Sequence, residues 1–235
     1  MVLGMKDKKL IVAHRGEHSK ARENTLEAFE NAVKCGAEML EFDVRRTCDG
    51  ELIIHHNEGI ADHLLSTIDY PRAIALAADL GYHVPRLAET LDLLAGRILL
   101  DVEIKEASYE TAILAILQDH LRSEDYLITS FLAETVSRIR SCNPEVRVGL
   151  LVTDVSGSRA LEMFHQTGAS LLAPEYMILD EETFAQAARS RIPLLPWTVN
   201  NAREIAHCLQ EPSVLGLITD EPAKALQIRG ALIVH

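Results

Sequence analysis

Short apolar runs alternate with amphipathic stretches along most of the chain, and this alternation most limits the folds open to it. The repeat takes roughly 20 to 25 residues, as expected for a strand, a helix and their loops. The predicted strands lie near Leu10–Ala13, Glu38–Val44, Ile98–Ile104, Tyr126–Thr129, Val146–Val152, Ser170–Ala173, Leu194–Val199 and Leu215–Thr219. Eight such units in 235 residues predict an α/β fold, the (β/α)8 TIM barrel.

The main alternative is a doubly wound open sheet. Such sheets commonly carry a glycine-rich phosphate loop after the first strand, and neither GxGxxG nor GxxxxGK[ST] occurs there. Residues 58–84 break the regular alternation and include Pro71, so we expect a short insertion or small cap after the second strand. No linker or low-complexity segment divides the chain, which predicts a single domain over residues 1–235.

Charge and cysteine content limit the partners and the compartment. A net charge of -12 argues against a nucleic-acid partner. Four scattered cysteines without a CxxC pair favour reduced thiols. The N-terminus is too short in apolar residues for a signal peptide, and no run approaches the ~18 apolar residues of a membrane span. We therefore expect a cytoplasmic protein without stable membrane insertion, and its oligomeric state is left open.

Carboxylates recur with a spacing of two residues on two of the predicted strands. Glu41 and Asp43 share one face of their strand, and Asp101 and Glu103 share one face of the next. Acids that converge at a barrel rim repel one another unless a cation lies between them. Oxygen ligands favour Mg²⁺ or Ca²⁺. We predict a site formed by Glu41, Asp43 and Glu103, with Asp101 as a structural polar residue deeper in the strand.

Two histidines and two cations follow apolar runs and are expected at the same rim. His14 and His56 are candidates for proton transfer, because imidazole titrates near neutral pH. Arg15 and Lys105 are candidates to bind a phosphate, although salt bridges to the acids are an alternative use. Trp197, the only tryptophan, ends a predicted strand and is expected to wall the substrate pocket.

Eight motifs in this order resemble the glycerophosphodiester phosphodiesterase family, within the phospholipase-C-like phosphodiesterase barrels. A single motif such as HRG would be weak, but the ordered set spans nearly the whole chain. The motifs are HRG at 14–16, ENTLEAF at 23–29, EFDVRRTCDGELIIHHN at 41–57, VPRLAETL at 84–91, VEIK at 102–105, TSF at 129–131, WTVN at 197–200 and GLITDEP at 216–222.

The resemblance implies a TIM barrel that hydrolyses glycerophosphodiesters to sn-glycerol 3-phosphate and an alcohol, with a divalent cation, Mg²⁺ or Ca²⁺. A lysophospholipase-D-like activity on lysophospholipids and a non-catalytic barrel that binds phosphate esters are the alternatives. By position, the resemblance implies a general acid/base pair, a phosphate-binding arginine, pocket residues, metal ligands and two residues that support the first loop. The acid/base pair is His14 and His56, the phosphate-binding arginine is Arg15, and the pocket residues are Lys105 and Trp197. The metal ligands are Glu41, Asp43 and Glu103, and the residues that support the first loop are Glu23 and Asn24.

Two positions depart from the family pattern. Arg22 stands where the family usually has proline, and we expect little consequence beyond the stiffness of the loop. Asn57 stands where the family usually has aspartate after the second histidine. If that carboxylate orients or charges His56, asparagine is expected to weaken proton transfer or to lower the pKa of the histidine.

Overall fold

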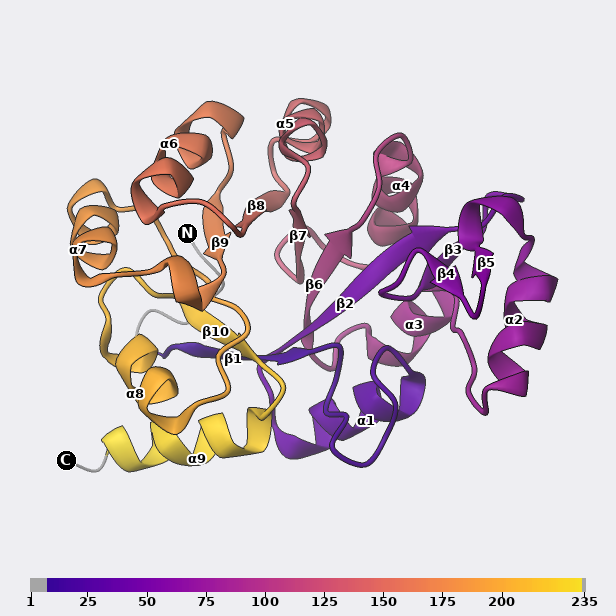
Figure 1. The fold of residues 1–235 in the computed structure, drawn as a ribbon, viewed down its shortest axis with the longest axis horizontal. Coiled ribbons are helices and arrows are strands. Elements are labelled where there is room, and N and C mark those ends of the chain that lie inside the picture. Colours follow the sequence, from indigo (N-terminus) through magenta and orange to yellow (C-terminus); the bar gives the residue numbers. More distant parts are fainter. Residues whose placement is uncertain (1–7, 234–235) are drawn as a thin grey trace.

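A computed structural model describes residues 8–233 and contains a curled parallel sheet surrounded by helices (Figure 1). Hydrogen bonds join neighbouring strands of the sheet in one order. That order is β10 (Gly216–Thr219), β1 (Leu10–His14), β2 (Met39–Arg46), β6 (Leu99–Ile104), β7 (Tyr126–Ser130), β8 (Arg147–Val152) and β9 (Leu171–Pro174). The predicted α/β barrel is confirmed, with strand bounds within about two residues of those expected.

Residues 193–199 occupy the eighth position, between β9 and β10. Leu195 donates its backbone N–H to Leu172 on one side, and Leu215 donates to Leu194 on the other. Pro193 and Pro196 lack an N–H, so the segment cannot form a continuous ladder. The prediction of a regular strand at Leu194–Val199 is therefore wrong. The segment nevertheless lies where that strand was expected.

The helices lie outside the strands. Thr25 accepts a hydrogen bond from Ala28 N at the start of the first helix, and Gly36 ends it in the left-handed conformation. The other helices follow their strands in chain order. The helices of the barrel are α1 (Leu26–Cys35), α3 (Leu87–Leu94), α4 (Glu110–His120), α5 (Ala133–Cys142), α6 (Gly157–Thr167), α7 (Glu181–Ser190), α8 (Ala202–Gln210) and α9 (Pro222–Ile233), with a 3₁₀ turn, η2 (Tyr176–Ile178), after β9.

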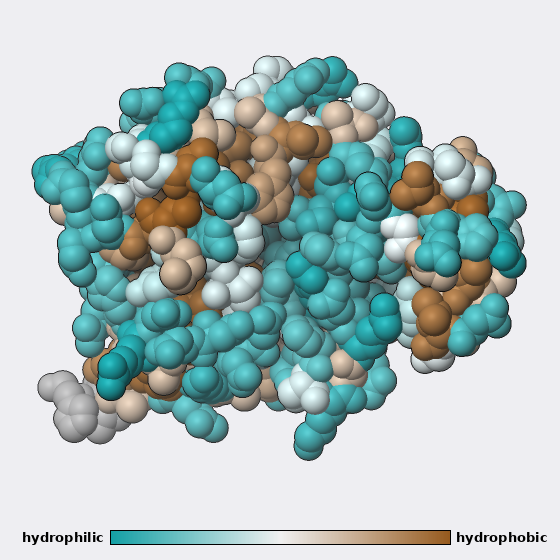
Figure 2. Space-filling model, in the orientation of Figure 1, coloured by the Kyte–Doolittle hydropathy of each residue, from teal (hydrophilic) through white to brown (hydrophobic). Residues whose placement is uncertain are grey.

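The insertion is more regular than expected. It contains α2 (Tyr70–Asp79), in which Pro71 lies in the first turn and Asp69 caps the backbone N–H of Arg72. Pro71 therefore starts a helix instead of disrupting the segment. The exposed side chains of Leu64 and Leu80 belong to this region, where Figure 2 shows apolar surface at the right of the view. The other elements of the insertion are β4 (Gly59–Ile60), β5 (His63–Leu64) and η1 (Leu65–Thr67), and β3 (Leu52–Ile54), which pairs antiparallel with β2, precedes it.

The core has an inner part within the barrel and an outer part between strands and helices. Leu10, Val12 and Leu127 belong to the inner part, toward the amino ends of the strands. Polar residues replace apolar ones toward the carboxyl ends, as in Asp43 and Glu103. In residues 8–233, no helix is both long and apolar enough to cross a membrane. Because active sites of such barrels lie at the carboxyl ends of the strands, the polar end of this barrel is the expected position of a functional site.

Candidate active site

The three predicted metal ligands converge at the carboxyl ends of β2 and β6. Parallel pairing places Asp43 beside Glu103, and Glu41 beside Asp101. One carboxylate oxygen from each of Glu41, Asp43 and Glu103 lies within 4.8 Å of the other two. All three side chains are buried, with exposed fractions of 3%, 0% and 7%. The i, i+2 spacing in the sequence therefore becomes a compact cluster of acids.

The electrostatics of this cluster suit a cation. Burial and the neighbouring Asp43 raise the pKa of Glu103 to about 7. Burial, Asp43 and Glu103 also raise the pKa of Glu41 well above its usual range. Oε1 of Glu41 is buried and has no hydrogen-bond partner in the part of the chain described. Such an orphaned oxygen among three carboxylates fits a hard divalent ion.

Two cations already offset part of this charge. The Lys105 Nζ atom lies 2.9 Å from Asp43 Oδ1 and 2.6 Å from Glu103 Oε1. The Arg15 Nε atom lies 3.2 Å from Asp43 Oδ2. Although burial disfavours its charge, these cations hold the pKa of Asp43 below its usual range. Salt bridges to the acids and binding of a phosphate are thus compatible roles for Arg15 and Lys105, since each contacts the acids and also lines the pocket.

The loop between β1 and α1 positions Arg15 by its backbone conformation. Arg15 and Asn24 both have positive φ, 53° and 56°. The backbone N–H of Arg15 donates to Glu41 Oε2 at 2.9 Å, and its Nη1 donates to Glu23 at 3.0 Å. Asn24 Nδ2 donates to Asp43 Oδ2 at 2.7 Å. Glu23 and Asn24 therefore connect the loop to the acidic cluster.

His14 is oriented by a residue from the other end of the chain. Its Nδ1 lies 2.7 Å from Asp220 Oδ1, and its Nε2 lies 3.9 Å from Glu41 Oε2. Asn200 donates to the other oxygen of Asp220 at 2.7 Å. Although burial opposes it, hydrogen bonds from His14 and His18 lower the pKa of Asp220. This pair leaves Nε2 of His14 facing the pocket, with a carboxylate behind it.

The imidazole of His56 has a neutral hydrogen-bond partner, and its backbone is held by Arg45. Its Nδ1 lies 3.0 Å from Asn57 Oδ1, and its carbonyl accepts a hydrogen bond from Arg45 Nε at 2.8 Å. Burial lowers the pKa of His56, and the charge of Asp43 offsets only part of this effect. The hydrogen bond to Asn57 raises this pKa, so the shift comes from burial and does not test the effect expected from asparagine in place of aspartate. Asn57 nevertheless occupies the position from which it can fix the tautomer of His56.

A pocket of about 180 Å³ joins these groups, and its far wall is apolar. The Trp197 indole N–H donates to the carbonyl of Ala173 at 2.8 Å, which fixes the ring. Phe131 meets it edge to face, with ring centroids 5.4 Å apart. The remaining apolar lining comes from Leu151 and Ile218. The pocket thus has a charged side and an aromatic side.

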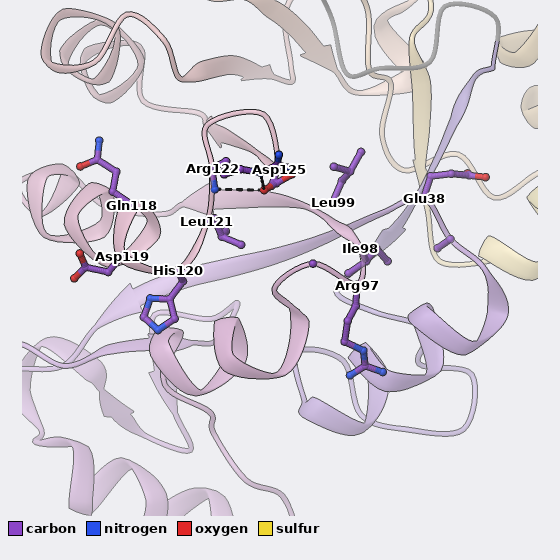
Figure 3. A pocket seen from close by; sticks show the side chains of 12 residues that line it. Glu38, Arg97, Ile98, Leu99, Gln118, Asp119, His120, Leu121, Arg122 and Asp125 are labelled. Carbon is purple, nitrogen blue, oxygen red and sulfur yellow. Dashed lines mark hydrogen bonds and ion pairs between the residues drawn. The ribbon is translucent and has the colours of Figure 1, made fainter.

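A larger cavity, of about 770 Å³, lies at the opposite end of the barrel (Figure 3). Its lining includes Leu99 and Asp125, at the amino ends of β6 and β7. Its two arginines are already paired, Arg97 with Glu30 and Arg122 with Asp125. Both arginines that line the cavity within residues 8–233 are thus engaged, and the cavity lies away from the acidic cluster, so we place the site at the carboxyl ends.

The structure brings the predicted residues together. His14, Arg15, Glu41, His56, Glu103, Lys105 and Trp197 line the pocket, and Asp43 lies behind them in contact with Lys105. Sequence reasoning missed two neighbours of these groups. Asp220 follows the last strand and Phe131 follows β7, the positions at which barrels carry functional side chains. That positional signal could have identified both.

The chain matches the family model described as the glycerophosphoryl diester phosphodiesterase family over residues 14–92 and 97–224. A glycerophosphodiester phosphodiesterase from Caldanaerobacter subterraneus is 25% identical over 242 residues, covering 94% of this chain and 98% of that protein. One from Bacillus subtilis is 27% identical over 256 residues, covering 92% and 85%. A human lysophospholipase D matches locally, with 41% identity over 49 residues, 21% of this chain and 16% of that protein.

Solved structures share the fold. A glycerophosphodiester phosphodiesterase from Parabacteroides distasonis superposes with a TM-score of 0.84 at 20% identity, covering 97% of this chain and 100% of that one. An Oleispira antarctica phosphodiesterase, in complex with the product sn-glycerol-3-phosphate, superposes with a TM-score of 0.82 at 20% identity, covering 93% and 96%. With the family model matching most of its length, this chain belongs to the glycerophosphoryl diester phosphodiesterase family.

Proposed function

We propose that this chain hydrolyses glycerophosphodiesters to sn-glycerol 3-phosphate and an alcohol. One observation supports this most strongly: two buried carboxylates, backed by a third, face the same small pocket as an arginine, a lysine and two histidines. The family membership and the product named in the Oleispira complex give the substrate class. Charged groups of both signs around one pocket suit a phosphodiester and its departing alkoxide.

Glu41, Asp43 and Glu103 would hold the divalent cation, Mg²⁺ or Ca²⁺, through oxygen ligands. When bound, the ion supplies positive charge that stabilises negative charge developing on the phosphoryl oxygens. Arg15 and Lys105 border the same pocket and bind the remaining phosphate oxygens. The raised pKa values show that Glu41 and Glu103 hold protons tightly without a metal, so binding of the cation would release those protons.

His14 and His56 act as the acid/base pair. Each has one ring nitrogen engaged, by Asp220 and by Asn57, and each lines the pocket. One accepts the proton of the attacking hydroxyl and the other protonates the departing alkoxide. Removal of a general acid or base costs on the order of 10² to 10⁴ in rate. Water and the 2-hydroxyl of the glycerol are both compatible nucleophiles, the second giving a cyclic phosphate first.

Turnover of glycerophosphocholine, with and without EDTA, tests the proposal. We expect release of sn-glycerol 3-phosphate that EDTA abolishes and that His14→Ala and His56→Ala each lower by about 10² or more. His83→Ala is the matched control, because His83 is an exposed histidine of the insertion. Near-native turnover by either histidine variant, with metal present, would overturn the assignment. No turnover of any diester would favour a barrel that only binds phosphate esters.

A second candidate is a lysophospholipase-D-like activity. The aromatic side of the pocket, Phe131 and Trp197, supports an apolar substituent, and so does the local match to a human lysophospholipase D. Competition between glycerophosphocholine and lysophosphatidylcholine separates the two candidates. We expect the higher kcat/KM for glycerophosphocholine.

We also propose that residues 1–235 form one domain and that the protein works in the cytoplasm. Cys35, Cys48, Cys142 and Cys208 are all free thiols in the structure, which is compatible with a reducing compartment. A single cooperative unfolding transition and fractionation of cells that produce the protein test these two points. The expectation about a signal peptide falls partly on residues 1–7, which lie outside the described range.

A further inference from the structure

A small polar cavity adjoins the main pocket on the side of the insertion. Its volume is about 20 Å³, and its lining includes Arg22, Asn57 and Tyr82. His56 lines both this cavity and the main pocket, so the two meet at that ring. Arg22 and Tyr82 are therefore neighbours of His56 on the side away from the metal-ligand candidates that line only the main pocket.

Arg22 has a fixed position but no opposite charge. Its guanidinium carbon lies 3.7 Å from the centroid of the Tyr82 ring. The ring is held from another side by His55, whose Nε2 lies 3.3 Å from the Tyr82 hydroxyl. Glu23, the carboxylate in the cavity lining, is paired with Arg15, and Arg22 forms no ion pair with any residue in the range 8–233. The positive charge of Arg22 is thus available to a ligand.

The contact also decides what Tyr82 can bind. An aromatic face is the usual partner of a quaternary ammonium group. Here the guanidinium of Arg22 covers that face. A trimethylammonium group near this cavity would find the aromatic face occupied and a positive charge opposing it. The contact with Tyr82 is a structural feature of Arg22 in addition to the loop stiffness expected from the sequence.

We propose that Arg22 and Tyr82 form a subsite for the departing alcohol, and that it favours an alcohol with a negative charge over one with a quaternary ammonium group. The proposal rests on the proposed hydrolysis of glycerophosphodiesters. It further places the departing alcohol on the His56 side of the pocket. The substrate class is then a glycerophosphodiester whose alcohol carries a carboxylate or a second phosphate.

Three esters of similar shape test the subsite. Their alcohols are choline, its uncharged carbon analogue 3,3-dimethylbutanol, and the anion of 4-hydroxybutyrate. For the wild type we expect kcat/KM to be highest for the anionic ester and lowest for the choline ester. In Arg22→Gln, the preference for the anionic over the uncharged ester should fall roughly three- to fivefold, the size typical of one exposed charge pair. Added salt should reduce the wild-type preference in the same direction.

Arg22→Lys is the matched variant, since it keeps the charge and should keep most of the preference. Tyr82→Leu removes the ring that holds Arg22 and should lower the preference, whereas Tyr82→Phe keeps the ring and should retain it. Equal preference in the wild type and Arg22→Gln would overturn the subsite and leave the proposed hydrolysis intact. If the wild type hydrolyses none of the esters, the proposed function fails. Calorimetric binding of the same esters to wild type and Arg22→Gln then decides the subsite independently.

Discussion

The orientation of His14 depends on Asp220, which contacts its Nδ1 at 2.7 Å. In Asp220→Asn the negative charge behind the imidazole is lost while the size of the side chain is kept. We expect kcat to fall on the order of 10², with KM little changed, because the interaction matters most when His14 carries a proton. Asp154→Asn is the control, an exposed aspartate that follows β8. Steady-state kinetics with near-native kcat for Asp220→Asn would exclude this positioning role.

His56 provides a second prediction, about pH. Burial lowers its pKa, and its Nδ1 partner, Asn57, is uncharged. A carboxylate at that position favours the imidazolium, so Asn57→Asp should raise the pKa of His56. The limb of the pH profile of kcat/KM that reports His56 should move to higher pH, whether the residue acts as acid or base. A profile that is unchanged, or that moves to lower pH, contradicts this assignment.

The sequence predicted those site residues whose type and spacing indicate a chemical role by themselves. Paired acids with a spacing of two identified Glu41, Asp43 and Glu103, because strand geometry turns that spacing into a shared face. The contact of Asp220 with His14 could not be predicted from a local pattern, because the two residues are 206 positions apart in the sequence. The contact of Arg22 with Tyr82 could not be predicted from the sequence either, since it depends on how the insertion packs against the first loop.

Among the elements, the loop from β1 to α1 is the most constrained. Gly16 has a φ of 95°, and a Cβ there would lie 2.7 Å from Cβ of Ala28. Gly36 has a φ of 85° but open space around it. Gly36→Ala should therefore cost about 1–2 kcal/mol from the backbone alone. Gly16→Ala should cost more and should also reduce kcat/KM, because the displaced loop carries Arg15.

Chemical denaturation and kinetics of both glycine variants check this prediction. Equal losses of stability, with activity retained in Gly16→Ala, would show that the crowding at Ala28 is relieved without moving the loop. The same elements show where pattern reading succeeds. Strands with continuous apolar runs were placed well, whereas the segment with Pro193 and Pro196 was expected to be regular and is not. Pro71 suggests an irregular segment from sequence alone, but it lies in the first turn of α2, where proline fits.

At the scale of the whole molecule, the acidic cluster links stability to pH. The pKa of Glu103 is raised from 4.5 to about 7 in the folded protein without a cation. The folded state therefore binds this proton more tightly than the unfolded state. The resulting stabilisation is fully present below the unfolded pKa and is lost as the pH rises through the folded pKa. Without metal, Glu103 should thus lower stability between about pH 4.5 and about pH 7.

A divalent cation should reverse this effect. Binding stabilises the folded state by about 2.7 kcal/mol at 100 times the dissociation constant. For a chain of this length, each kcal/mol corresponds to roughly 2–4 °C in Tm, so we expect a rise of about 5–10 °C. The rise should be larger at about pH 8 than at about pH 6, because protons compete with the ion for Glu41 and Glu103.

Scanning calorimetry of EDTA-treated protein, before and after addition of Mg²⁺ or Ca²⁺, measures these shifts in Tm. Glu103→Gln removes one ligand and its titration together, so it should lose most of the metal-induced rise and its dependence on pH. Glu145→Gln, at an exposed glutamate between α5 and β8, is the matched control and should behave as the wild type. If the rise were equal at both pH values and in Glu103→Gln, the ion would be binding elsewhere. The cluster of Glu41, Asp43 and Glu103 would then be a structural network of charges and not a metal centre.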